Sequence, residues 1–170
     1  MQNFFGQKTI LVVDDEKSVR ESLNKVLSKE GYRVLEAESG EEALSICRKE
    51  FVNLVLTDLK MPEMDGLELL KALKLLQPDV AVIMMTAYGT IEKAVEAMKE
   101  GASDFILKPF KRFELEKSLS KGLEHQTLLL ENRYLKQQLE STGQKLLNII
   151  GTSPAMRKVL TLIEQIAPSS

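Results

Sequence analysis

Five polar side chains of complementary chemistry each follow an apolar run of the sequence. The carboxylates, the hydroxyl and the ammonium are those of Asp14, Asp15, Asp58, Thr86 and Lys108. If these runs are parallel strands of one sheet, their carboxyl ends share one edge, where such sheets bind ligands. Three carboxylates, a hydroxyl and an ammonium at one edge would suit a divalent cation and a phosphoryl group. The pattern therefore predicts metal-assisted phosphoryl chemistry.

The three carboxylates would repel one another at close range unless a cation joined them. Mg²⁺ is the expected cation, because it is a hard ion that takes oxygen ligands and often bridges one or two carboxylates to a phosphate. We expect Asp15 and Asp58 to ligate it directly and Asp14 through a water. Asp58, which precedes the loop LKMPEMDG, is the predicted nucleophile and would form an aspartyl phosphate.

The remaining two side chains would act on the phosphoryl oxygens. The ammonium of Lys108 would offset their charge, and the hydroxyl of Thr86 would donate a hydrogen bond to one of them. Pro109 follows the lysine, so a cis peptide bond that fixes the direction of Lys108 is predicted. Taken singly, each residue also fits an ordinary loop, cap, turn or solvated charge. The hypothesis depends on their joint order.

The elements that must position these residues alternate between short apolar runs and helical spacing, which is the signature of βαβ units. With right-handed crossovers, this alternation predicts a small doubly wound α/β domain whose five-stranded parallel sheet is covered on both faces. The predicted strands are residues 9–13, 33–37, 54–57, 80–85 and 105–107.

Helix signals lie between the predicted strands. Ser18 with Glu21, and Ser39 with Glu42, have the spacing of capping boxes. Gly31 is predicted to end the first helix. The third helix is expected between Gly66 and Pro78, the fourth over 90–101 and the fifth after Pro109. The expected inward residues of the third and fourth helices are Leu69, Leu70, Leu73, Leu76, Ile91, Ala94, Val95 and Met98.

Composition favours a packed domain. Of the 170 residues, 44% are hydrophobic and 28% charged, which is too apolar for a disordered chain. A net charge of -2 lacks the basic character that duplex binding needs, so direct DNA binding is not expected. The apolar runs are far shorter than the roughly 20 residues that span a bilayer, and the first residues do not resemble a secretory signal. We expect a cytoplasmic protein, with the single Cys47 packed on a helix face.

Residues 8 to 122 resemble the receiver domain of two-component response regulators. The matching segments are VDDE, LTDLKMPEMDG, MTAYG and LKPF. This resemblance implies a flavodoxin-like fold, Mg²⁺ as cofactor and phosphotransfer to Asp58 from a sensor histidine kinase, with the backbone carbonyl of Lys60 as a further metal ligand. It also implies a switch, in which Thr86 moves toward the phosphoryl group, Phe105 turns inward, and the surface of the fourth helix, fifth strand and fifth helix changes.

In such domains, the residues two after the nucleophile and two after the threonine border the path of the hydrolytic water. Here they are Lys60 and Tyr88, both bulky, so we expect slow self-dephosphorylation and no other enzymatic turnover. One alternative is a Mg²⁺-dependent phosphatase with an aspartyl nucleophile. Sites resembling the haloacid dehalogenase group place a D-x-D after the first strand, however, whereas this first strand ends in Asp14 and Asp15. Another alternative is an interaction module that is never phosphorylated.

Residues 123–147 favour a long polar helix that pairs as a coiled coil. Asn132 at an a position, and Glu131 at g opposite Lys136 at e, favour a parallel homodimer. Thr142 and Gly143 weaken the last heptads, so a single solvated helix is the alternative. The predicted a positions are His125, Asn132, Leu139 and Leu146, and the d positions are Leu128, Leu135, Thr142 and Ile149.

Residues 148–170 resemble the opening of the AAA+ ATPase domain in sigma-54-dependent activators of the NtrC and DctD type. Ser153 is predicted to cap a helix that begins at Pro154. The sequence holds no G-x-x-x-x-G-K-[ST] loop, so we expect no ATPase activity and a chain truncated ahead of that loop. The resemblance implies that the full-length protein acts on sigma-54 RNA polymerase and DNA through further domains. From the heptads of the linker, we expect the unphosphorylated receiver pair to hold the ATPase inactive until phosphorylation rearranges it, and the opposite sign of control is the alternative. A tail packed back on the receiver is the alternative. The apolar face of this helix would consist of Met156, Val159, Leu160, Ile163 and Ile166.

Overall fold

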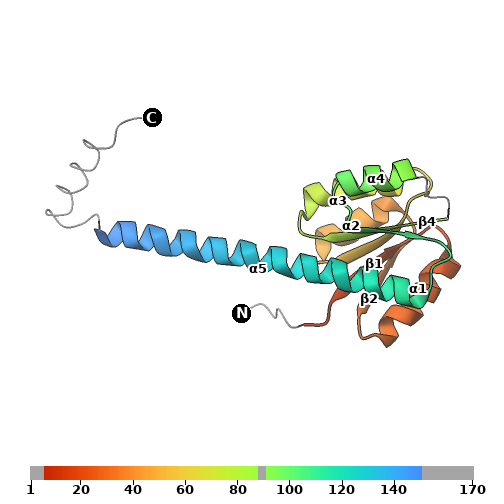
Figure 1. The fold of residues 1–170 in the computed structure, drawn as a ribbon, viewed down its shortest axis with the longest axis horizontal. Coiled ribbons are helices and arrows are strands. Elements are labelled where there is room, and N and C mark those ends of the chain that lie inside the picture. The colour runs from red at the N-terminus through yellow and green to blue at the C-terminus, as the bar shows by residue number, and fades with distance from the viewer. Residues whose placement is uncertain (1–5, 88–90, 151–170) are drawn as a thin grey trace. The chain divides into compact units, whose positions relative to one another are not determined.

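Strands and helices alternate along the chain in the computed structural model, which describes residues 6–87 and 91–150, with side chains for 6–87 and 92–139 (Figure 1). The strands are β1 (Thr9–Val13), β2 (Arg33–Ala37), β3 (Leu54–Asp58), β4 (Ala81–Thr86) and β5 (Asp104–Leu107). The helices are α1 (Lys17–Lys29), α2 (Gly40–Lys49), α3 (Gly66–Leu76), α4 (Ile91–Lys99) and α5 (Arg112–Ile150). The chain divides into two compact units, Met1–Leu129 and Leu130–Ser170.

All strand pairs are parallel, and the sheet has the order β2-β1-β3-β4-β5. This is the flavodoxin-like order, so the predicted fold class is confirmed. The third and fourth strands end one residue later than predicted, because backbone pairing continues through polar residues. Asp58 pairs with Met85, and Thr86 pairs with Leu107. Two of the predicted site residues are therefore the last residues of strands.

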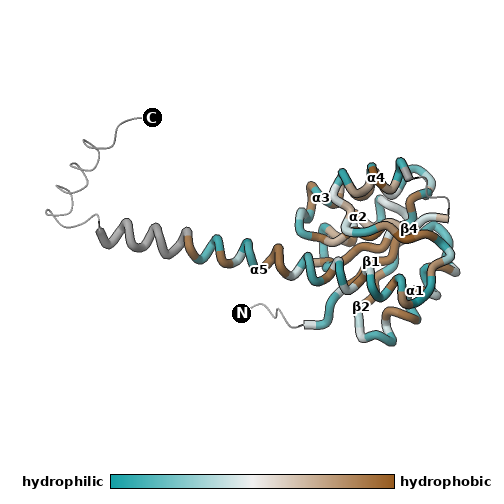
Figure 2. Tube along the Cα trace, viewed as in Figure 1, coloured by the Kyte–Doolittle hydropathy of each residue, from teal (hydrophilic) through white to brown (hydrophobic). Residues whose placement is uncertain are grey.

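The sheet is buried on both faces, as its continuous apolar strands require. Successive side chains of a strand point to opposite faces, so Leu11 and Val13 pack with α2, α3 and α4, whereas Ile10 and Val12 pack with α1 and α5. The strands form the hydrophobic centre of the domain in Figure 2. Cys47 lies in the first of these clusters, as predicted, and burial raises the pKa of its thiol to about 11.

The predicted capping box of the first helix is wrong. The helix begins at Lys17 after Glu16, which makes no side-chain cap, so Ser18 lies inside the first turn. The cause is the preceding loop, where the backbone N–H of Glu16 donates to Asp14 Oδ1 at 2.9 Å and sets the turn earlier. The predicted capping box of the second helix forms only in part. Ser39 Oγ accepts from the backbone N–H of Glu42 at 3.2 Å, whereas Glu42 Oε2 accepts from the N–H of Glu38 rather than from that of Ser39.

Helix α4 faces the sheet differently from the prediction. Val95 and Met98 are each 46% exposed, and Ala97 is fully buried in their place. A small side chain on the inward face lets a helix lie close to the sheet, and the larger apolar residues then turn toward solvent. Leu76 at the end of α3, also predicted inward, is 39% exposed. The side chain of Ile91 lies outside the described residues.

Helix α5 (Arg112–Ile150) includes the residues of the predicted linker. Leu123 and Gln126 are still buried, whereas Leu128, Leu135 and Leu139 are exposed. The three exposed leucines occupy predicted a and d positions, and the coiled coil itself stays a prediction. The side chains of Thr142, Leu146 and Ile149, and the predicted helix after Ser153, lie outside the described residues. In the described part of the chain, no helix is both long and apolar enough to cross a bilayer.

A buried chain of polar groups joins α5 to the start of the sheet. The backbone N–H of Thr9 donates to Asn53 Oδ1 at 2.8 Å, and Asn53 Nδ2 donates to Gln126 Oε1 at 3.3 Å. Because a backbone N–H can only donate, the oxygen of Asn53 must face β1 and its NH₂ group must face α5. One amide therefore satisfies groups on two elements.

Replacing Asn53 with alanine should lower the free energy of unfolding by about 1–3 kcal/mol, because it leaves two buried polar groups unpaired. Urea denaturation of the two proteins measures this difference. The matched control is Gln7→Ala, which removes an exposed amide bonded only to Gly31 O and should change stability by less than about 0.5 kcal/mol. Equal stabilities for Asn53→Ala and the wild type would contradict the role of the buried chain.

Candidate functional site

The carboxyl ends of four strands bring the predicted site residues to one edge of the sheet. Asp14 directly follows β1, Asp58 ends β3, Thr86 ends β4, and Lys108 directly follows β5. Asp14, Asp58 and Thr86 are all buried, with relative exposures of 0%, 8% and 2%. These polar groups are therefore held at the edge of the core rather than on a solvated loop.

The ammonium of Lys108 bridges two of the carboxylates. Its Nζ lies 2.6 Å from Asp14 Oδ2 and 2.7 Å from Asp58 Oδ1. Burial alone would lower the pKa of the ammonium, but the hydrogen bonds and charges of the two aspartates outweigh burial, and the net pKa is raised above 10.5. Lys108 is therefore a permanent cation at neutral pH.

The second oxygen of each aspartate is held by its own loop. Asp14 Oδ1 accepts from the backbone N–H of Glu16, and Asp58 Oδ2 accepts from the backbone N–H of Lys60, both at 2.9 Å. Each carboxylate is thus fixed on both oxygens, by the ammonium on one side and by a backbone N–H on the other. Such double fixing pre-organises the direction of the carboxylate before any ligand arrives.

Gly66, at the start of α3, allows the helix to lie directly against Asp58. A Cβ atom on Gly66 would lie 2.3 Å from the backbone oxygen of Asp58 and 3.0 Å from the Cα of Leu59. The approach is fixed by a full capping box, in which Asp65 Oδ1 accepts from the N–H of Glu68 and Glu68 Oε2 accepts from the N–H of Asp65. From the sequence, Gly66 was expected only to mark the start of the third helix, and this role was not predicted.

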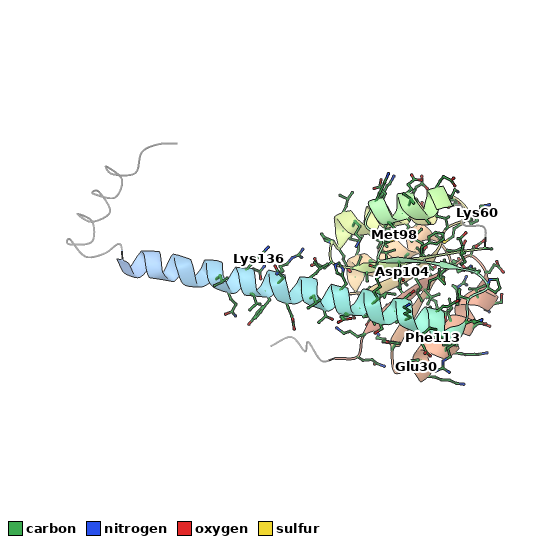
Figure 3. The ribbon with its side chains drawn as sticks, viewed as in Figure 1. Glu30, Lys60, Met98, Asp104, Phe113 and Lys136 are labelled. Carbon is green, nitrogen blue, oxygen red and sulfur yellow. The ribbon has the colours of Figure 1, made fainter. Side chains whose placement is uncertain are left out.

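The other predicted site residues differ in how far they are buried. Asp15 and Lys60 are exposed, and Phe105 is half-buried against the core cluster that contains Met84. Lys60 is labelled in Figure 3. The backbone carbonyl of Thr86 accepts from the N–H of Lys108 at 2.7 Å. The predicted cis peptide bond before Pro109 is confirmed. Tyr88 lies outside the described residues.

The donor set suits a hard cation, although the side chains are not gathered around one point. Carboxylate and carbonyl oxygens of Asp14, Asp15, Asp58 and Lys60 are the ligand types that Mg²⁺ prefers. Among the described side chains, those of residues 6–87 and 92–139, no three His, Cys, Asp or Glu residues converge in a metal-binding arrangement. The ammonium of Lys108 lies between the two buried carboxylates. The oxygen ligands are therefore of the type that Mg²⁺ binds. Their side chains would have to change position to coordinate one ion together.

Fold and site together define a doubly wound α/β domain with an acidic centre closed by a lysine. The response regulator receiver domain model matches residues 10–120, and the chain belongs to this family. It is 40% identical over 164 residues to the transcriptional regulatory protein ZraR of Salmonella typhimurium, a match that covers 96% of this chain and 36% of that protein. It is 34% identical over 159 residues to the C4-dicarboxylate transport transcriptional regulatory protein DctD of Rhizobium meliloti, covering 94% and 34%.

A solved structure supports the same assignment. The beryllofluoride-activated NtrC4 receiver domain dimer matches with a TM-score of 0.66 and 35% identity, over 70% of this chain and 99% of that one. The present chain spans about a third of the length of these two transcriptional regulators. It carries a regulatory receiver domain of the kind found in these transcriptional regulators. Receiver domains generally bind Mg²⁺ at their phosphorylation site.

Replacing Gly66 with alanine should slow phosphorylation of the domain by roughly tenfold to a hundredfold, because the new methyl group must displace the backbone of Asp58. The rate of labelling by acetyl phosphate measures this effect. Gly31→Ala is the matched control, since Gly31 has a φ of 89° and no neighbour within 4 Å of its added Cβ. The control should lose about 1–2 kcal/mol of stability and keep its labelling rate. A normal rate in Gly66→Ala would show that the close approach is unimportant.

Replacing Lys108 with methionine should make the stability of the domain more dependent on Mg²⁺. Without the ammonium, Asp14 and Asp58 repel each other, and the cation no longer competes with Lys108 for their oxygens. Melting temperatures with and without Mg²⁺ measure the effect, and the Mg²⁺-induced rise should be larger in the variant than in the wild type. Lys111→Met, at an exposed lysine nearby in the sequence, serves as the control. An unchanged or smaller rise in Lys108→Met would contradict the competition.

Proposed function

We propose that the domain accepts a phosphoryl group on Asp58 from a sensor histidine kinase, with Mg²⁺, and that this modification controls adjoining domains in the cytoplasm. The observation that supports Asp58 most directly is the difference in exposure between the two buried carboxylates. The side chain of Asp58 is 12% exposed, whereas that of Asp14 is 1% exposed. Of these two fixed carboxylates, Asp58 has the better access for an incoming phosphorus atom.

In the proposed step, an oxygen of Asp58 attacks the phosphorus of a phosphohistidine, the P–N bond breaks, and the imidazole leaves with that electron pair. Asp14, Asp15, Asp58 and the carbonyl of Lys60 would hold Mg²⁺, which neutralises charge on the phosphoryl group. Lys108, already 2.7 Å from Asp58 Oδ1, would shift its hydrogen bond to a phosphoryl oxygen. Thr86 is next to Met85, the residue paired with Asp58, and its hydroxyl would donate to another of these oxygens.

The proposed switch surface consists of α4, β5 and α5. Val95, Met98 and Leu107 are large apolar residues on it with exposures of 46%, 46% and 56%, and Met98 is labelled in Figure 3. Exposed apolar residues that gather on one surface are typical of an interface. Movement of Thr86 and inward rotation of Phe105 would change this surface, because Phe105 is on β5. We propose that the surface and the predicted linker heptads form a homodimer.

A proposal for a longer protein that contains this chain is supported by the resemblance to sigma-54-dependent activators and by the similarity to ZraR and DctD. We propose that the receiver pair represses an adjoining ATPase domain until phosphorylation rearranges the dimer. That ATPase would act on sigma-54 RNA polymerase at a promoter. Because this chain spans about a third of those relatives, these activities would belong to further domains.

Beryllofluoride with Mg²⁺ tests the proposed function, because it mimics a phosphoryl group on the aspartate. Light scattering should report a changed oligomeric state or dimer compactness for the wild type. Asp58→Asn should not respond. A wild type unaffected by beryllofluoride would favour an unphosphorylated interaction module, and turnover of a small phosphate ester would favour a phosphatase.

The self-dephosphorylation rate tests the predicted shielding of the phosphoryl group. Lys60→Asn combined with Tyr88→Ala should lose phosphate several-fold faster than the wild type, because smaller side chains open the path of the attacking water. The decay of phosphorylated protein, followed by mass, measures the rate. The exposed neighbour Glu63 provides a control in Glu63→Gln. Equal rates for the double variant and the wild type would remove the shielding hypothesis.

A further inference from the structure

Arg20 is a buried arginine that contacts the backbone of both acidic residues after β1. Its Nη1 donates to the carbonyl oxygen of Asp14 at 2.6 Å and to that of Asp15 at 3.3 Å. The residue is 9% exposed, and a charged side chain is seldom buried so deeply unless it is paired. Arg20 is therefore not an ordinary solvated charge on the surface of α1.

The guanidinium also forms an ion pair with a carboxylate on β2. Arg20 Nε lies 3.7 Å from Glu36 Oε2, and Glu36 Oε1 accepts from Asn24 Nδ2 at 2.5 Å. Glu36 pairs with Val12 in the β1–β2 register, and the backbone N–H of Asp14 donates to the carbonyl of Ala37 at 3.2 Å. Groups from α1 and β2 thus fix the position of one guanidinium behind the acidic loop.

The contact acts on the backbone of the acidic loop. Arg20 donates to the carbonyl oxygens of Asp14 and Asp15 and does not occupy a carboxylate oxygen of either residue. The direction of a carboxylate ligand depends on the backbone that carries it, most of all for Asp15, whose side chain is exposed. Outer partners that orient metal ligands typically change metal affinity by about 10–100-fold when they are removed. A guanidinium suits the position because its planar fork forms several hydrogen bonds in a fixed geometry.

We propose that Arg20 is a positioning residue for the metal site, which orients Asp14 and Asp15 toward the cation by holding their carbonyl oxygens. This inference rests on the proposed function, since it concerns the Mg²⁺ that phosphorylation of Asp58 would use. Glu36 and Asn24 support Arg20 from the neighbouring elements.

Charge and positioning predict opposite effects of removing the guanidinium. Arg20 is itself a cation close to the site, so its charge opposes Mg²⁺ binding. If only charge mattered, Arg20→Gln would bind Mg²⁺ more tightly and Arg20→Lys would equal the wild type. If positioning dominates, Arg20→Gln binds more weakly. Arg20→Lys then lies in between, because a lysine keeps the charge but lacks the fork.

The first measurement is a Mg²⁺ titration followed by the backbone amide NMR signals around Asp14 and Asp58. The Kd for Mg²⁺ should rise by roughly tenfold or more in Arg20→Gln and by less in Arg20→Lys. The control is Arg33→Gln. Arg33 is the first residue of β2 and pairs with Glu50, so its removal should leave the Kd for Mg²⁺ unchanged.

The second measurement separates positioning from a general structural defect. The rate of phosphorylation by acetyl phosphate should need more Mg²⁺ for half-saturation in Arg20→Gln and should approach the wild-type rate at saturating Mg²⁺. A rate that excess Mg²⁺ does not restore, or a Kd equal to or below that of the wild type, would overturn the inference. If Arg20→Gln does not fold, an unchanged Kd in Arg20→Lys overturns it as well. If the backbone amide signals of the wild type do not shift when Mg²⁺ is added, the proposed function is overturned, and this inference with it.

Discussion

The bridge from Lys108 to Asp14 and Asp58 is the interaction on which the site depends. The partners are 94 and 50 residues apart in sequence, and they come from the ends of β5, β1 and β3. Because β4 lies between β3 and β5 in the sheet, the bridge forms only when these strands are in order. One ammonium between two carboxylates leaves a net negative charge, which is the condition for a further cation to bind.

The surrounding loops fix the orientation of the two carboxylates. Backbone N–H groups of Glu16 and Lys60 hold the oxygens that Lys108 does not, and Gly66 lets α3 lie against Asp58 without a clash. These contacts are made by backbone atoms, which have few alternative positions once the strands and helices are packed. The chain thus orders the carboxylate of Asp58, the proposed acceptor, before any phosphoryl donor arrives, which would reduce the reorganisation needed during transfer.

The sequence predicted the sheet and the site edge because both depend on simple patterns. Continuous apolar runs indicate buried parallel strands, and the polar residue after each run lies at the sheet edge whatever the details of the helices. Local signals were less reliable. The S-x-x-E pattern of Ser18 predicted a cap that the Asp14–Glu16 contact displaced. The helical spacing of Val95 and Met98 did not reveal that Ala97 faces the sheet.

Other features had a readable signal or none. The D-x-x-E pattern of Asp65 indicates a capping box, which was not predicted. The glycine that follows Asp65 was a sign that the helix lies close to another backbone segment. The contacts of Arg20 with two carbonyl oxygens could not be predicted, because a pattern of side chains contains no information on which backbone atoms they meet.

The proposed function depends on covalent phosphorylation at position 58. The most direct test is the intact mass after incubation with acetyl phosphate and Mg²⁺: the wild type should gain one phosphoryl group and Asp58→Asn none, whereas no gain, or an equal gain in both, would contradict it.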